Sequence, residues 1–135
     1  MCIRDRSAEQ HCAMIKLLMI FAGGGLGSLC RYSIGAVLLK NIDGHFPWTT
    51  FAANAIGCLC IGLLAGYFER RQAGLVYMLL VTGFCGGFTT FSTFSNESVQ
   101  LMRQGFYSLA LGYMALSMCT GLMCTASGFW AAKNI

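Results

Sequence analysis

Four long segments of this chain carry almost no charge, and they limit the folds open to it more than any other feature. They cover residues 17–39, 49–68, 72–96 and 104–132, and among them only the first holds a charged residue, Arg31. A helix needs about 20 apolar residues to cross the hydrocarbon core of a bilayer. The sequence therefore predicts an all-α integral membrane protein with four transmembrane helices.

The overall composition supports the same class. Of the 135 residues, 56% are hydrophobic and 10% are charged, whereas a typical soluble domain has about 25% charged residues. The formal net charge is +4, but the basic residues are scattered at segment ends and form no patch, so no nucleic-acid partner is expected. The eight cysteines form no Cys-x-x-Cys pair, which argues against a metal cluster.

The first residues differ from the rest of the chain. Residues 1–13, MCIRDRSAEQHCA, are polar and charged and have no apolar core, so they do not form a signal peptide. We expect them to be a disordered extension, and residues 14–135 to form the membrane domain. Within that domain the spans are expected near 15–39, 49–68, 74–95 and 106–132, with residues 97–105 as a polar end and a short loop.

Orientation in the membrane is poorly specified by charge. From Met14 on, the side that carries both termini holds four basic residues and the other side holds two; the four are Lys16, Arg70, Arg71 and Lys133, and the two are Lys40 and Arg103. Basic residues favour the cytoplasmic side. So weak a bias suits either a protein that inserts both ways round or one with both termini inside.

The third span has an unusual middle, rich in glycine, threonine and serine from Gly83 to Ser95. These residues are poor choices for a plain membrane helix. A break in a span is tolerated only where it is buried in protein or lines a polar cavity. We therefore expect the third helix to be broken at mid-membrane. The freed carbonyls from Gly86 to Thr89 are candidates to hold a hard cation such as Na⁺.

Polar side chains inside the other spans have two readings each. Arg31 either snorkels to the nearby interface or supplies a fixed positive charge that draws anions to a vestibule. Asn54 either makes an interhelical hydrogen bond or offers its amide donors to a passing anion.

Two more sets of side chains have the spacing of a single helix face. Tyr113, Ser117 and Thr125 lie on one stripe of the last span, where their hydroxyls either bond their own backbone or pass an anion along. Phe91 and Phe94 share a face after the break. Their rings either pack in the core or present positive edges to an anion.

Residues 14–130 resemble the small bacterial fluoride channel family known as Fluc or CrcB. The matching pieces are Gly-Gly-Gly-Leu-Gly-Ser with Arg31 and Tyr32 in the first span, Ala-Asn-Ala-Ile-Gly around Asn54, and GFCGGFTTFSTFS followed by Glu97. The third piece is the most specific, because its thirteen residues have so unusual a composition. Residues 1–13 have no counterpart in the family pattern.

The resemblance implies an antiparallel, dual-topology homodimer with two fluoride pores. It places a structural Na⁺ at the dimer centre, on backbone carbonyls of Gly86 and Thr89. It also assigns a set of side chains to the pore: Asn54, Phe91, Phe94, Tyr113, Ser117 and Thr125. Gly121 interrupts the hydroxyl track of the last helix, since it has no side-chain donor.

The expected function is a passive, fluoride-selective channel in the bacterial inner membrane that exports cytoplasmic fluoride and relieves its toxicity. The alternative is a small multidrug-type exporter of the four-helix dimer class. It is disfavoured because no acidic residue lies deep in a predicted span; Glu69 and Glu97 are placed at segment ends. An enzyme is not expected, because no Ser/His or His/Asp pair lies within the spans.

Overall fold

The computed structural model describes residues 6–38, 44–71 and 74–134, and all its regular elements are helical. In chain order they are α1 (Arg6–Ser33), the π-helical segment η1 (Ile34–Leu38), α2 (Trp48–Phe68), α3 (Gly74–Tyr77), the π-helical segment η2 (Met78–Cys85), α4 (Gly86–Phe88), α5 (Phe91–Arg103) and α6 (Tyr107–Lys133). Four stretches are long and apolar enough to cross a membrane: Arg6–Val37, Trp48–Phe68, Gly74–Arg103 and Tyr107–Lys133. The prediction of an all-α protein with four candidate spans is confirmed.

The helix α1 begins earlier than the sequence predicts. Residues 6–13, which we expected to be disordered, form its first turns, while residues 1–5 and 39 lie outside the described part of the chain. Adding residues to an existing helix costs little, because nucleation is the expensive step. Ala8, Glu9 and Gln10 are also good helix formers. The assignment of residues 1–13 to an extension outside the membrane domain stays a prediction.

The third span also runs further than predicted. We expected it to end near Ser95, but α5 continues to Arg103. It stops at Gly105, which has a φ of +89°, a conformation that glycine adopts readily. Two backbone hydrogen bonds close the turn, from Gly105 N–H to the Met102 carbonyl at 3.1 Å and from Phe106 N–H to the Leu101 carbonyl at 2.9 Å. This is a Schellman motif, and it turns the chain back into α6.

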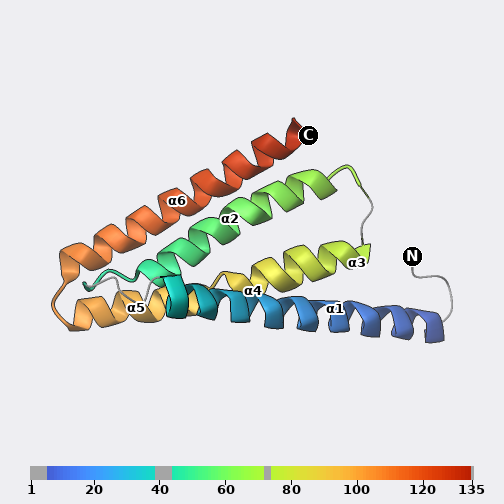
Figure 1. The fold of residues 1–135 in the computed structure, drawn as a ribbon, viewed down its shortest axis with the longest axis horizontal. Helices are drawn as coiled ribbons and strands as arrows, with labels where there is room; N and C mark the ends of the chain where they lie inside the picture. The colour runs from blue at the N-terminus through green and yellow to red at the C-terminus, as the bar shows by residue number, and fades with distance from the viewer. Residues whose placement is uncertain (1–5, 39–43, 72–73, 135) are drawn as a thin grey trace.

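Two pairs of helical segments pack closely through glycines. In Figure 1, α2 and α6 lie side by side, and the third span lies along α1. A Cβ built on Gly128 of α6 would come within 2.8 Å of the Leu63 nitrogen of α2. A Cβ on Gly27 of α1 would come within 2.8 Å of the Phe88 nitrogen. Small residues at these positions allow the backbones to touch, as is usual where membrane helices pack.

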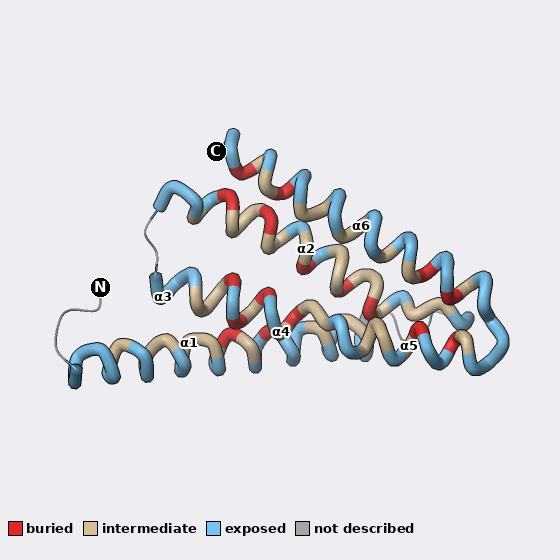
Figure 2. The backbone as a smooth tube through the Cα atoms, turned by 180° about the vertical axis from the view of Figure 1, so that it is seen from behind, coloured by how far each residue is buried: buried red, intermediate tan, exposed pale blue. Residues whose placement is uncertain are grey.

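The bundle has a small interior and a largely apolar exterior. Its core cluster consists of Leu101, Ala110 and Tyr113, at the end where α5 meets α6. Figure 2 shows buried residues as short stretches on the inner sides of the helices, with much of α1 and α6 exposed. Phe21 on α1 is 81% exposed and Leu122 on α6 is 71% exposed. An apolar surface of this extent requires lipid or another protein chain to cover it.

Candidate functional site

The third span is broken at Thr89 and Thr90. Both residues have extended backbones, with φ/ψ of −85°/155° and −150°/123° respectively. The Thr90 side chain then starts α5 as its N-cap, accepting a hydrogen bond from Thr93 N–H at 3.3 Å. Our prediction of a break over Gly86–Thr89 was therefore placed too early. Gly86 has helical dihedrals, and the neighbouring glycines Gly83 and Gly87 serve the close approach to α1 rather than the break itself.

Asn54 of α2 holds the break in place. Its Oδ1 accepts a hydrogen bond from Thr90 N–H at 2.9 Å, and its Nδ2 donates to the Thr90 carbonyl at 3.2 Å. A side-chain amide thus satisfies both backbone groups of one extended residue, as a neighbouring strand would. The interhelical hydrogen bond, one of the two readings of Asn54, is present. One N–H of its amide has no partner among the described residues and stays available.

The same hydrogen bonds take donors away from the two carbonyls predicted to bind a cation. In a continuous helix the N–H of residue i+4 meets the carbonyl of residue i. The Thr90 N–H instead donates to Asn54, so the Gly86 carbonyl loses that partner. The Thr93 N–H donates to the Thr90 hydroxyl, so the Thr89 carbonyl loses its own partner. Both predicted positions therefore carry carbonyl oxygens deprived of their helical donors.

A groove with a cavity volume of about 300 Å³ lies beside the break. Its lining comes from α2, α5, α6 and the two threonines of the break, and no described lining residue is charged. Five of the residues singled out from the sequence line it: Asn54, Thr89, Phe91, Phe94 and Ser117. Gly121 also lines it, as do Cys58, Ile61, Thr90 and Met118. The fold thus brings together an amide, hydroxyls and two phenyl rings from distant parts of the sequence.

Ser117 is the least satisfied polar group in this groove. Its Oγ is buried and has no hydrogen-bond partner among the described residues. Buried polar groups almost always have a partner, so an unpaired one requires an explanation. Together with the free N–H of Asn54, it gives the groove two hydrogen-bonding groups that are not used within the fold.

Apart from Gly86, three other predicted residues lie away from this groove. Tyr113 is fully buried, and its hydroxyl donates to Glu97 Oε2 at 3.1 Å. Thr125 lines a second hollow further along α6. Arg31 is half-buried in the last turn of α1, and its buried Nε has no partner among the described residues. The stripe along α6 is therefore divided between the core, the groove and a separate hollow.

Glu97 is the residue that sequence reasoning misplaced. It lies inside α5, within the third candidate span, and not at a segment end. Its carboxylate accepts hydrogen bonds from Thr50 Oγ1 at 2.8 Å and from Tyr113. The apolar residues Val99, Leu101 and Met102 beyond it were the signal that the helix continues. The prediction that Glu97 lies at a segment end is therefore wrong, although the residue lies six positions before the end of this candidate span and not at its middle.

No group of three or more His, Cys, Asp or Glu side chains able to hold a metal ion occurs in the part of the chain that the structure describes. Any metal site there would have to use other ligands, and backbone carbonyls at the break are of that kind.

Four candidate spans, a broken third span and an uncharged groove between helices define a small multi-pass membrane protein. Residues 18–129 match the family described as CrcB-like protein, Camphor Resistance (CrcB). The chain belongs to this family, as its resemblance predicted.

Relatives with known names agree with this family assignment. A fluoride-specific ion channel FluC from Flavobacterium psychrophilum is 44% identical over 124 residues, which cover 90% of this chain and 100% of the relative. One from Phocaeicola vulgatus is 40% identical, covering 89% of this chain and 100% of the relative. One from Gloeothece citriformis is 38% identical, covering 90% and 99%. These relatives are named as ion channels and not as enzymes, in agreement with the expectation for this chain.

Proposed function

We propose that this chain is a passive, fluoride-selective ion channel and that the groove beside the break forms part of its conduction path. The observation that carries the proposal is the groove itself: the free N–H of Asn54 and the unpaired hydroxyl of Ser117 lie on the same uncharged hollow as Phe91 and Phe94. Fluoride is proposed as the conducted ion because the relatives are named fluoride-specific ion channels.

Fluoride is small and strongly hydrated, so a path through the membrane must replace its water with hydrogen-bond donors. An amide N–H and a hydroxyl are such donors. The positive edges of aromatic rings attract an anion more weakly, which allows the ion to leave as well as enter. A groove without lysine or arginine would hold the ion loosely enough to conduct it.

The working unit is proposed to be an antiparallel homodimer with dual topology. Phe91 faces the groove but is 79% exposed, and the groove is open on one side. A second copy would close that side and cover part of the exposed apolar surface. The weak bias of basic residues, four on one membrane face against two on the other, suits insertion in both orientations. In such a dimer the break at Thr89 and Thr90 would lie near mid-membrane.

A structural Na⁺ at the dimer centre is proposed on the carbonyls of Gly86 and Thr89. These oxygens fit a hard cation, since their helical donors are directed elsewhere. The ion would supply a positive charge that holds the two broken spans together. Export of cytoplasmic fluoride across the bacterial inner membrane, down its gradient, is the role that such a channel would have.

Fluoride efflux from liposomes that contain the purified protein tests the function. We expect fluoride to leave these vesicles much faster than protein-free vesicles, while chloride stays inside. Chloride leaving as fast as fluoride, or fluoride leaving no faster than from empty vesicles, would contradict the proposal.

The cation is tested separately by replacing Na⁺ with N-methylglucamine on both sides of the membrane. We expect fluoride efflux to fall and the dimer to melt at a lower temperature. Efflux and melting temperature that stay unchanged would rule out the cation site but leave the channel function standing.

A further inference from the structure

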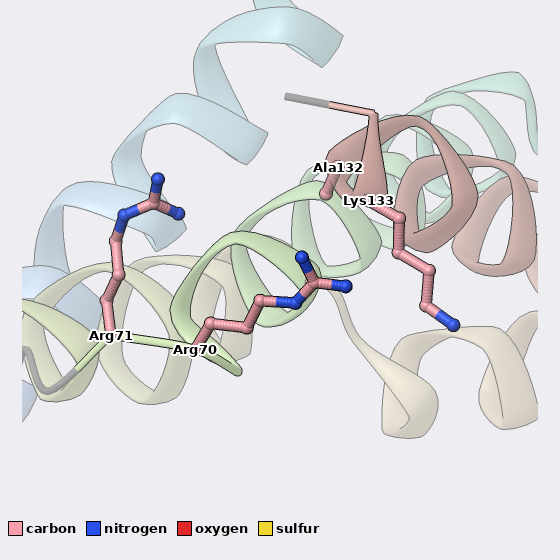
Figure 3. Close-up of a pocket in the computed structure, with 5 residues that line it drawn as sticks. Arg70, Arg71, Ala132 and Lys133 are labelled. Atoms are coloured by element: carbon pink, nitrogen blue, oxygen red, sulfur yellow. The ribbon is translucent and has the colours of Figure 1, made fainter.

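A basic pocket lies at the opposite end of α2 and α6 from the core cluster, where both helices finish. Its volume is about 200 Å³, and it is lined by Gly66, Arg70, Arg71, Ala132 and Lys133. None of its described lining residues is acidic. Figure 3 shows Arg70 extending from the end of α2 toward α6, with Lys133 on the neighbouring helix end.

The basic residues of the pocket differ in how far they are engaged. Arg71 is held at the end of α2: its Nη1 donates to the Tyr67 carbonyl at 3.0 Å, and its guanidinium lies 4.0 Å from the centre of the Tyr67 ring. Among the described residues, Lys133 contacts only the Phe129 ring, whose centre lies 5.4 Å from its Nζ. Arg70 makes no hydrogen bond or ring contact to any described residue. Arg70 and Lys133 are thus the charges free to bind an anion.

A second hollow continues from the pocket along α6. It has a volume of about 460 Å³ and is lined by Leu122, Thr125, Ala126, Phe129, Trp130 and Lys133. Lys133 lines both hollows. From Leu122 to Lys133 the helix rises by about 17 Å, which is close to half of a hydrocarbon core of about 30 Å. The basic pocket at the span end therefore leads into an apolar groove whose length along α6 is about the thickness of one leaflet.

We propose that the two hollows together bind one anionic glycerophospholipid. Its phosphate would lie between Arg70 and Lys133, and one acyl chain would lie along α6 from Phe129 toward Leu122. Basic pockets between membrane helices are suited to phospholipid headgroups. Tyr67 contacts Arg71 of the pocket, and Trp130 lines the second hollow; aromatic residues are enriched at the level of the headgroups. A free phosphate ion would use the basic pocket alone and leave the apolar groove without a role.

Native mass spectrometry of the purified full chain in detergent, titrated with phosphatidylglycerol, tests this proposal. We expect one tightly bound lipid per chain. Arg70→Gln and Lys133→Gln should each weaken binding by about fivefold. Ala126→Trp should also weaken it, because the indole would fill the acyl groove without changing any charge. All three side chains are exposed, so these variants should fold.

Arg103→Gln is the matched control, since Arg103 is also exposed but lies at the end of α5, outside both hollows. It should bind phosphatidylglycerol as the wild type does. Equal affinity for phosphatidylcholine, displacement of the lipid by inorganic phosphate, or equal losses in Arg70→Gln and Arg103→Gln would each overturn the proposal. So would undiminished lipid binding by Ala126→Trp.

Discussion

The two parts of the third span, before and after the break, are held in the bundle by different means. Before the break, η2 and α4 touch α1 backbone to backbone, so that a Cβ on Gly87 would come within 2.9 Å of the Gly24 Cα. After the break, α5 is held by side chains: Glu97 pairs with Thr50, and the Phe94 ring lies 5.2 Å from that of Tyr113.

Because the backbone is interrupted at the break, one span can both pack against α1 and line the groove. The glycine-packed part fixes the span against α1 and has little side-chain chemistry of its own. The part after the break carries the rings and hydroxyls that line the groove. Asn54 joins the two parts by bonding the extended Thr90. Each substitution below is chosen to disturb one part or the junction.

The largest effect is expected from Gly27→Val on α1, which disturbs the packing against the part of the third span before the break. A Cβ there would press on the Phe84 carbonyl and lie 2.8 Å from the Phe88 nitrogen, so the backbones must separate. We expect the free energy of unfolding in detergent to fall by about 3 kcal/mol. Gly25→Val is the control, since nothing lies within 4 Å of a Cβ at that position. Equal unfolding midpoints for the two variants would show that the close packing is unimportant.

The next effect is expected at the junction, from Asn54→Ala. The change leaves both the N–H and the carbonyl of Thr90 without their partners. Leaving these partly buried backbone groups unpaired should lower the free energy of unfolding by about 2 kcal/mol. Asn96→Ala removes the same amide from an exposed position and should cost much less. Similar losses in the two variants, measured by chemical denaturation, would disprove the role given to Asn54.

The four spans and the presence of a break in the third could be predicted from the sequence, but the position of the break could not. Apolar length alone located the four spans, because the bilayer requires it. A run such as Gly86-Gly87 looks like a helix breaker, yet here it is helical, and Gly87 allows the close approach to α1. Which role a glycine has depends on the neighbouring helix, and a single sequence does not show that neighbour.

The candidate site was predicted unevenly for a similar reason. Asn54, Phe91, Phe94 and Ser117 do meet at one groove, as their polarity and spacing suggested. Tyr113 does not line it, because its hydroxyl is bonded to Glu97 in the core. The charge of Glu97 was expected to end the third span. Its carboxylate instead lies within that span because it accepts hydrogen bonds from Thr50 of α2 and Tyr113 of α6. These are tertiary contacts, which the sequence alone does not show.

A smaller effect is expected at the start of α5, from Thr90→Ala. Losing the N-cap hydrogen bond to Thr93 should lower the free energy of unfolding by about 1 kcal/mol. Thr90→Ser keeps a hydroxyl that can cap the helix and should behave almost as the wild type. The two variants are compared by denaturation in the same detergent, and a serine variant as unstable as the alanine variant would refute the capping role.

The smallest effect on stability is expected within the groove, from Ser117→Ala. Its Oγ makes no hydrogen bond to any described residue, so its removal should change the free energy of unfolding by less than about 0.5 kcal/mol. Fluoride efflux should nevertheless fall, because a donor is lost from the proposed path. Ser127→Ala, at an exposed position on the same helix, should leave efflux unchanged. Full efflux in Ser117→Ala would exclude its hydroxyl from the path.

The central claim is that the part of the third span after the break forms the wall of a fluoride path, and Phe91 tests it most directly. Phe91 is 79% exposed and Phe21 is 81% exposed, so neither ring is needed for the packing of a single chain. The measurement is fluoride efflux from liposomes that contain Phe91→Ile or, as a control, Phe21→Ile. We predict that Phe91→Ile loses fluoride efflux while it stays folded, and that Phe21→Ile keeps it. Full efflux through Phe91→Ile would contradict the account.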